Sequence, residues 1–386
     1  MRQLAFALLA GLMPAIAQDL TITNARIVAG NGTVIERGSI VVRGGKIASV
    51  AAGAPASTAG RVIDAKGMSA MPGFIDGHRH INTGPNEKAQ MQALLEAGYT
   101  TILSGGGPAE GNITLRDHIE QGVINGPRII PSGRVALNLT PDAARAEIRK
   151  LAAQGVKFTG EISLTPIPGP SEKEIETLKA IVDEGKKAGV VIQVHAVSSS
   201  AMLAAVDAGV PLLVHLPNKD WVSKEAAAKV AAAGTKVLGT VGFGTPVFGV
   251  FATDNQARFR DGKQWPQGIV DGVRLGEEAG YMPVNARTIW DAGAVLGYCT
   301  DTTYDPLAGL DHELKILNAM FSMQDLVKMM GPNTASYIQM GDQLGTLEPG
   351  KLADIILLDG NPMEGYWNWL RTKLVVKGGK VVVEKL

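Results

Sequence analysis

Residues 72–80 read PGFIDGHRH, a short apolar run that leads directly into two histidines. In an extended strand alternate side chains share a face, so His78 and His80 point the same way and Arg79 points away from them. Two imidazoles about 7 Å apart along a strand can converge on one metal ion. Because this spacing by itself is a weak signal, its meaning depends on what the other strands of the chain carry.

Seven more apolar runs follow, and helical stretches such as residues 171–188 and 224–233 lie between them. The eight candidate strands are residues 74–76, 100–103, 128–130, 156–159, 190–194, 212–214, 236–238 and 295–299. Eight strand–helix repeats within residues 71–340 predict an α/β fold, a parallel (β/α)8 TIM barrel. A doubly wound open sheet is the alternative, but no Gly-x-Gly-x-x-Gly opens a helix after the first strand.

The two ends of the chain share a sequence pattern that differs from that of the middle. Residues 18–70 and 341–386 contain short β-rich runs broken by glycine, such as SIVV at 39–42 and KVVV at 380–383. Neither end has enough strands for a stable sheet of its own. The sequence therefore predicts one small β-sandwich domain built from both ends.

Composition narrows the class of protein. The 386 residues include 37 Lys and Arg against 37 Asp and Glu, and a zero net charge argues against nucleic acid as the main partner. The 45% hydrophobic content is sufficient for a large core. One cysteine excludes an intrachain disulfide or a thiolate cluster, so a metal would need His and carboxylate ligands. We expect a small-molecule substrate and no membrane span, and a homo-oligomer is left open.

Ligand-type residues fall where the predicted barrel would place its chemistry, at the carboxyl ends of the strands. Glu161 ends the fourth strand, His195 the fifth, His215 the sixth and Asp301 the eighth, joining His78 and His80 of the first. Each has an ordinary alternative: a hydrogen-bonded structural histidine, a solvated glutamate, or in Asp301 a helix N-cap. Six such residues at one end of one barrel predict a metal centre. His118 is expected at the surface, and His312 is a candidate substrate contact.

The chain resembles the amidohydrolase superfamily in residues 72–80 and in the return segment 345–355, GTLEPGKLADI. Many members carry a carboxylated lysine on the fourth strand. Here residues 158–164 read FTGEISL, which resembles the bacterial enamidase type, in which a glutamate bridges the metals. The resemblance favours Glu161 over Lys157 as the bridging ligand. The presence of Arg79 between the two histidines is unexplained at this level.

The resemblance implies a binuclear centre. His78, His80 and Asp301 would hold one divalent ion, and His195 and His215 the other, with Glu161 and a hydroxide bridging them. Zinc is the first expectation, with iron or manganese as alternatives. The implied reaction is hydrolysis of an amide-type C–N bond, in a cyclic amide or an N-acyl compound, with Asp301 moving the proton. Ester or lactone hydrolysis, deamination and a non-catalytic binding protein are the alternatives, and specificity is expected in the loop 242–279.

The first 17 residues, MRQLAFALLAGLMPAIA, have the features of a cleavable export signal. The apolar run is shorter than the roughly 20 residues that a spanning helix needs. Ala15-Ile16-Ala17 has the small-x-small pattern of a signal peptidase site. A buried first strand or helix is the alternative. The sequence predicts a signal peptide at residues 1–17 and a periplasmic or secreted protein.

We expect the mature protein to begin near Gln18 when it is produced in a host with an export pathway, because cleavage follows Ala17. N-terminal sequencing of the purified protein, together with cell fractionation, checks this. An intact Met1 or a cytoplasmic location would reject the export signal.

Overall fold

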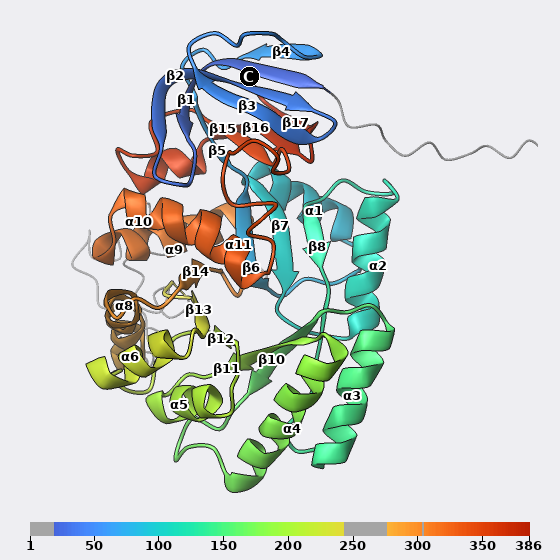
Figure 1. Cartoon of the computed structure of the whole chain (residues 1–386), viewed down its shortest axis with the longest axis vertical. Coiled ribbons are helices and arrows are strands. Elements are labelled where there is room, and N and C mark those ends of the chain that lie inside the picture. Colours follow the sequence, from blue (N-terminus) through green and yellow to red (C-terminus); the bar gives the residue numbers. More distant parts are fainter. Residues whose placement is uncertain (1–18, 243–275, 303–304) are drawn as a thin grey trace, which may run out of the picture.

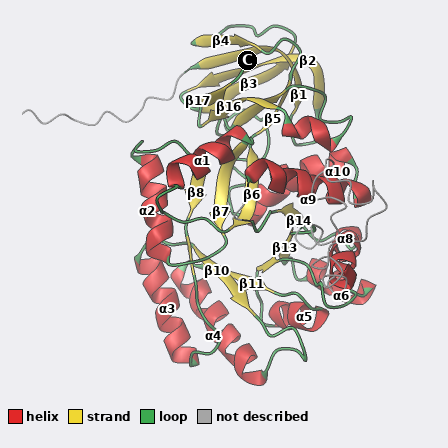
Figure 2. Ribbon diagram, turned by 180° about the vertical axis from the view of Figure 1, so that it is seen from behind, coloured by secondary structure: helices red, strands yellow, loops and turns green. Residues whose placement is uncertain are grey.

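The computed structural model describes residues 19–242, 276–302 and 305–386. The expected export signal and most of the predicted specificity loop 242–279 lie outside the described residues. Among the helices of the described part, none combines the length and apolar character needed to cross a bilayer. Figures 1 and 2 show a small β domain at one end of the molecule and, below it, a larger domain whose helices lie outside its strands.

The larger domain is built on parallel strands, as the sequence predicts. They are β6 (Phe74–Arg79), β7 (Tyr99–Ser104), β8 (Arg128–Ile130), β9 (Ser132–Gly133), β10 (Phe158–Ser163), β11 (Val191–His195), β12 (Leu212–Val214), β13 (Lys236–Gly239) and β14 (Leu296–Tyr298). They form one ladder from β6 to β8 and a second from β9 to β14. Only Pro131 separates β8 from β9, and a proline has no N–H to give to a ladder. The architecture is therefore TIM-barrel-like, with β8 and β9 together in the third strand position.

One expected strand end is wrong. The fourth strand, β10, continues to Ser163, so Glu161 lies inside the strand instead of ending it. The apolar run stops earlier because Thr159 and Glu161 are polar, yet Thr159 is fully buried. Lys157 precedes the strand and is exposed.

Helices alternate with these strands. They are α1 (Glu87–Glu96), α2 (Ala109–Glu120), α3 (Pro141–Ala153), α4 (Glu172–Ala188), α5 (Ser199–Asp207), α6 (Lys224–Ala232), α8 (Gly276–Asp291), α9 (Pro306–Met320), α10 (Met323–Lys328) and α11 (Thr334–Tyr337), with a π-helical turn at Met329–Asn333 and a 3-10 helix at Tyr366–Leu370. Local sequence sets the ends of α4: Ser171 and Glu174 form a capping box, and Gly189 ends the helix with φ of 71°.

The inside of the barrel-like domain is filled by side chains. Ile75, Leu103, Phe158 and Leu238, from four different strands, belong to one buried cluster. Tyr337 of α11 closes this cluster from below, and its hydroxyl bonds Gln193 of β11 at 3.2 Å. The packed interior holds the strands in fixed register, so their carboxyl ends form a stable platform.

Strands from both ends of the chain lie in one mixed sheet, which forms a separate β domain. Its strands are β1 (Leu20–Val28), β2 (Val34–Arg43), β3 (Lys46–Ala52), β4 (Arg61–Asp64), β5 (Ser69–Pro72), β15 (Ile355–Leu358), β16 (Thr372–Lys377) and β17 (Lys380–Glu384). The order is β17-β16-β15-β5-β1-β2-β3, with β4 also paired to β1. The sequence predicts a sandwich. In the structure the hydrogen bonds join these strands into a single continuous sheet, which packs around its own buried core.

The β domain determines where the first barrel strand starts. Strand β5 pairs antiparallel with β15, and only Gly73 separates it from β6. A Cβ added at Gly73 would lie 2.4 Å from the side chain of Thr100, so only glycine fits between β5 and β6. The ring of Trp369 stacks on Phe74 with centroids 5.8 Å apart, and this contact ties the C-terminal segment to β6.

Candidate metal centre

Six ligand-type side chains gather at the carboxyl ends of five parallel strands. His78 and His80 come from β6 and the residue after it, Glu161 from β10 and His195 from β11, while His215 follows β12 and Asp301 lies three residues beyond β14. Three overlapping groups have ligand atoms within 4.8 Å of one another: His78, His80 and Glu161; Glu161, His195 and His215; and His78, His215 and Asp301. The structure therefore brings together all six residues singled out in the sequence.

Glu161 lies at the centre of this cluster. Its Oε2 is 2.8 Å from Nδ1 of His195 and 3.0 Å from Nε2 of His215. Its Oε1 is 3.5 Å from Nε2 of His80, and Oε2 is 3.8 Å from Nε2 of His78. One carboxylate thus faces four imidazoles, three of them through Oε2 and one through Oε1.

Asp301 faces the histidines of the first strand. Its Oδ1 is 3.1 Å from Nε2 of His80 and 3.4 Å from Nε2 of His78, and its Oδ2 is 3.7 Å from Nε2 of His215. The backbone N–H of Asp301 donates to the carbonyl of His78 at 3.0 Å, so the eighth and first strand positions meet here.

The two carboxylates of the cluster favour positive charge on the groups around them. Burial disfavours the carboxylate of Glu161, but hydrogen bonds from His195, His215 and His80 outweigh it and hold the pKa of Glu161 below its usual range. The carboxylates of Asp301 and Glu161 in turn raise the pKa of His80 to about 9. Burial lowers the pKa of His215. A divalent cation among these atoms would supply the positive charge that protonated imidazoles otherwise provide.

The fit to a metal rests on unsatisfied buried atoms. Neither ring nitrogen of His78 has a hydrogen-bond partner, although the side chain is completely buried. Oδ1 of Asp301 is also buried and without a hydrogen bond, and it faces Nε2 of His78. Buried polar atoms in native proteins are normally satisfied, and an ion between these two would satisfy both.

The protein backbone is shaped to hold this cluster. His215 has φ of 68° and Asp301 φ of 51°, in the left-handed region that non-glycine residues seldom occupy. Such strain costs about 1–3 kcal/mol per residue and is typical of functional sites. At Gly105 an added Cβ would lie 2.7 Å from Nε2 of His78, so the absence of a side chain there makes room for the imidazole.

The sequence did not indicate Thr240, which orients one ligand. Its hydroxyl lies 2.8 Å from Nδ1 of His215, leaving Nε2 to face the cluster. Such contacts fix the tautomer and orientation of a metal-binding imidazole. The available signal was positional, because Thr240 directly follows β13, one of the three strand positions for which no ligand was expected.

The helix-cap alternative for Asp301 is wrong. Helix α9 is capped by Asp305, whose Oδ1 accepts a hydrogen bond from Ala308 N at 2.8 Å. Asp301 lies four residues earlier, with its carboxylate in the histidine cluster.

The structure also explains Arg79. The side chain points away from the histidines and is buried, and its guanidinium donates to Oγ1 of Thr300 at 3.1 Å and of Thr302 at 2.9 Å. These threonines flank Asp301. Asp76 joins the same network by accepting from the backbone N–H of Thr300. Arg79 therefore ties the first strand to the segment that carries Asp301.

The other two histidines lie outside this cluster. His118 is on α2, where it is partly exposed and pairs with Glu87 at 2.7 Å. His312, the candidate substrate contact, is buried on α9 and belongs to none of the three ligand groups.

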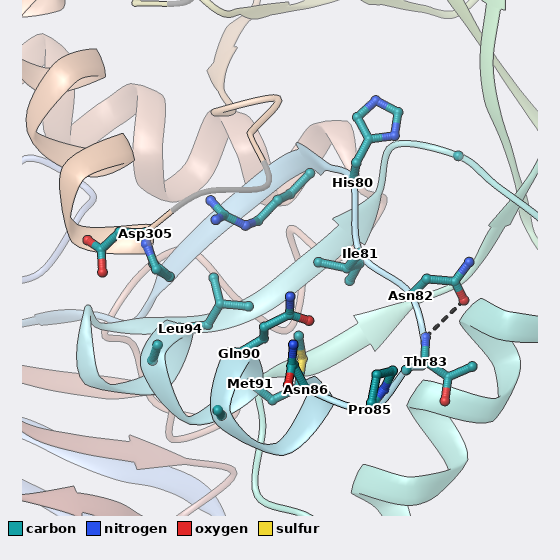
Figure 3. Close-up of a pocket in the computed structure, with 16 residues that line it drawn as sticks. His80, Ile81, Asn82, Thr83, Pro85, Asn86, Gln90, Met91, Leu94 and Asp305 are labelled. Atoms are coloured by element: carbon teal, nitrogen blue, oxygen red, sulfur yellow. Dashed lines mark hydrogen bonds between the residues drawn. The ribbon is translucent and has the colours of Figure 1, made fainter. Parts of the chain in front are cut away.

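Two cavities reach members of the cluster. One, of about 670 Å³, includes His80 and runs along the loop after β6 towards α1 and the start of α9. Figure 3 shows His80 at one end of it, with Asn82 and Thr83 on the following loop and Asp305 across the cavity. The second, of about 650 Å³, includes Glu161 and lies beside Arg134 and the start of α4.

Comparison with known proteins identifies the family. The model of the amidohydrolase family matches residues 69–236 and 280–382, more than half of the chain. The chain is 22% identical to imidazolonepropionase from Caldanaerobacter subterraneus, over 90% of this chain and 91% of that protein. It is 27% identical to enamidase from Eubacterium barkeri, over 44% of this chain and 47% of the enamidase. A solved structure from Bifidobacterium longum, assigned as a prolidase, has a TM-score of 0.80 and 26% identity over 95% of each chain.

These matches confirm the resemblance seen in residues 72–80 and 345–355, and the likeness to enamidase covers less than half of the chain. The family match includes all six clustered side chains and extends into the β domain. The chain belongs to the amidohydrolase family and is an enzyme, a metal-dependent hydrolase that acts on carbon–nitrogen bonds.

Proposed function

We propose that this enzyme holds two divalent metal ions and uses them to hydrolyse an amide-type C–N bond in a cyclic amide or an N-acyl compound. The observation that carries the proposal is that the carboxylate of Glu161 faces four histidines. A carboxylate can offer one oxygen to each of two ions, and two of the three ligand groups share Glu161.

In this proposal His78 and His80, with Asp301, hold one ion, and His195 and His215 hold the other. Two of the ligand groups support this division, because one contains His78 and His80 with Glu161 and the other contains His195 and His215 with Glu161. Zinc suits a set of imidazole and carboxylate ligands, and iron or manganese are the alternatives. We also infer that the two ladders close into one (β/α)8 barrel, because Asp301 bonds His78 between β14 and β6.

The chemistry follows from the ligands and from Asp301. When bound, the ions lower the pKa of a water molecule and polarise the carbonyl of the scissile bond. Asp301 has a second carboxylate oxygen, Oδ2, besides the Oδ1 that faces His78. It can therefore accept a proton at a carboxylate oxygen during attack and deliver it to the leaving nitrogen. Glu161, enclosed by imidazoles, is not free for that task.

We expect close to two divalent ions per chain in the metal-saturated protein and about one or fewer in Glu161→Ala, because both sites share this carboxylate. Elemental analysis after dialysis against zinc gives the numbers. Glu172→Ala, a change at an exposed residue of α4, is the matched control and should keep both ions. Saturation of the wild type at one ion, unchanged in Glu161→Ala, would contradict the bridging role.

Gly105→Ala should displace the imidazole of His78 and weaken metal binding, because the added Cβ would lie 2.7 Å from Nε2. Overpacking of this kind costs about 1–3 kcal/mol, so we expect bound metal to fall while circular dichroism stays unchanged. Gly280→Ala, in helix α8 with nothing within 4 Å of the added Cβ, is the control. Full metal occupancy in Gly105→Ala would show that His78 is not a ligand or can shift without loss.

Asp301→Asn should lower turnover about 10²–10⁴-fold, since asparagine keeps the shape but cannot accept the proton. The assay uses the substrate found by screening the zinc-loaded enzyme against N-acyl amino acids, dipeptides, cyclic amides and lactones. Asp291→Asn, at an exposed ion pair on α8, is the control. Wild-type kcat in Asp301→Asn with unchanged metal content would refute the catalytic role, and cleavage of lactones alone would refute amide hydrolysis.

A further inference from the structure

The cavity next to Glu161 contains two cationic side chains. It is lined by Arg134, Val135, Ala136, Leu137, Asn138, Glu161, Ser163, Lys173 and Glu174. Arg134 follows β9, at the third strand position, and Lys173 is in the first turn of α4. Both side chains are exposed, and among the described residues neither has a carboxylate within ion-pair distance. The cavity therefore presents free positive charge beside the metal centre.

The carboxylates of this cavity are already engaged. Glu174 accepts hydrogen bonds from the backbone and hydroxyl of Thr165, at 2.9 and 2.8 Å, and from those of Ser171, both at 2.8 Å. Glu161 faces the four histidines of the centre. Among the described residues, neither glutamate forms an ion pair with Arg134 or Lys173.

The backbone holds Arg134 near the cluster. A Cβ added at Gly106 would lie 3.5 Å from Nε of Arg134, and one added at Gly160 would lie 3.6 Å from its Cγ. The arginine stem thus lies over two glycines, and the second of them directly precedes Glu161. This packing keeps the exposed guanidinium of Arg134 close to the residue that precedes Glu161.

The cavity at His80 has a different character. It offers the amides of Asn82, Asn86 and Gln90 and the apolar side chains of Met91 and Leu94 (Figure 3). The guanidinium of Arg79 also reaches its wall but is bound to the threonines beside Asp301. In the described part of the chain, cations without an ion pair therefore lie on the Glu161 side of the centre, whereas the His80 side offers amides, apolar side chains and the carboxylate of Asp305.

We propose that Arg134, assisted by Lys173, binds a carboxylate of the substrate, so that the enzyme acts on acidic amides such as N-acyl amino acids or dipeptides. The proposal rests on the amide hydrolysis proposed above. A guanidinium binds a carboxylate through two parallel hydrogen bonds, and this fixes the orientation of the substrate as well as contributing affinity. The amide bond of such a substrate would then lie between the carboxylate site and the cavity at His80, at the metal centre.

Matched ligands test this on the zinc-loaded, full-length protein. The probes are N-acetyl-L-leucine and its neutral amide, N-acetyl-L-leucinamide, with binding measured by calorimetry and cleavage by release of leucine or leucinamide. We expect the acid to bind at least tenfold more tightly. Arg134→Met should weaken binding of the acid about 10- to 100-fold and leave the amide unchanged, as expected when a hydrogen bond to a charged group is lost. Arg134→Lys should retain part of the preference, and Lys173→Met should lower it less than Arg134→Met does.

Two substitutions at exposed residues elsewhere serve as controls. Arg43→Met, in the β domain, and Lys179→Met, on α4 outside the cavity, should leave both affinities unchanged. Equal affinity for acid and amide, binding of neither, or a preference that survives Arg134→Met would overturn the carboxylate site. The last result would place the carboxylate on the metal ions.

The two proposals fail in different ways. Preference for the acid that depends on Arg134, without cleavage of any amide, would reject the proposed hydrolysis and support the carboxylate site. Cleavage of acid and amide at equal efficiency would support the hydrolysis and reject the carboxylate site.

Discussion

The carboxylate of Glu161 and the four imidazoles around it form the interaction on which the rest of the site depends. Four nitrogen ligands and two carboxylates lie within a few ångströms of one another, in a region that is mostly closed to water. Such a cluster is stable only if positive charge lies inside it, from protons on the histidines or from metal ions. The raised pKa of His80 and the unsatisfied ring nitrogens of His78 both reflect this need for positive charge beside the two carboxylates.

Several features outside the cluster hold its members in place. His215 and Asp301 keep left-handed backbone conformations, which the packed interior of the barrel-like domain must stabilise against their strain. Thr240 fixes the imidazole of His215, and the guanidinium of Arg79 holds the threonines on either side of Asp301. Arg79 thus contributes to the geometry of the residue proposed to move the proton.

The β domain supports the site from a distance. It is joined to the first barrel strand at Gly73 and by the stacking of Trp369 on Phe74. Arg128 of β8 also forms an ion pair with Asp354, at 2.8 Å, immediately before β15. Because β6 carries His78, these contacts fix the start of the strand whose other end reaches the metal centre.

The sequence by itself determined the architecture and the identity of the clustered residues. Alternating apolar runs and helices give the strand order, and parallel strands bring their carboxyl ends to one edge, so residues far apart in the chain could be assigned to one site. Histidine and carboxylate side chains at those ends are few enough to be found by inspection. Cys299 packs into the interior of the barrel-like domain. The apolar strand next to it in the sequence accounts for this burial.

Only the tertiary structure decided the features that depend on contacts between distant segments. Glu161 lies within a strand and not at its end, because pairing with β11 extends β10 as far as Ser163. The choice between ligand and helix cap for Asp301 required the position of Asp305 relative to α9. The role of Arg79 depends on threonines more than two hundred residues away, and the free charge of Arg134 depends on which carboxylates other segments have already engaged. Side-chain type and local periodicity are carried by the sequence, whereas hydrogen-bond partners are chosen by the packing of the whole chain.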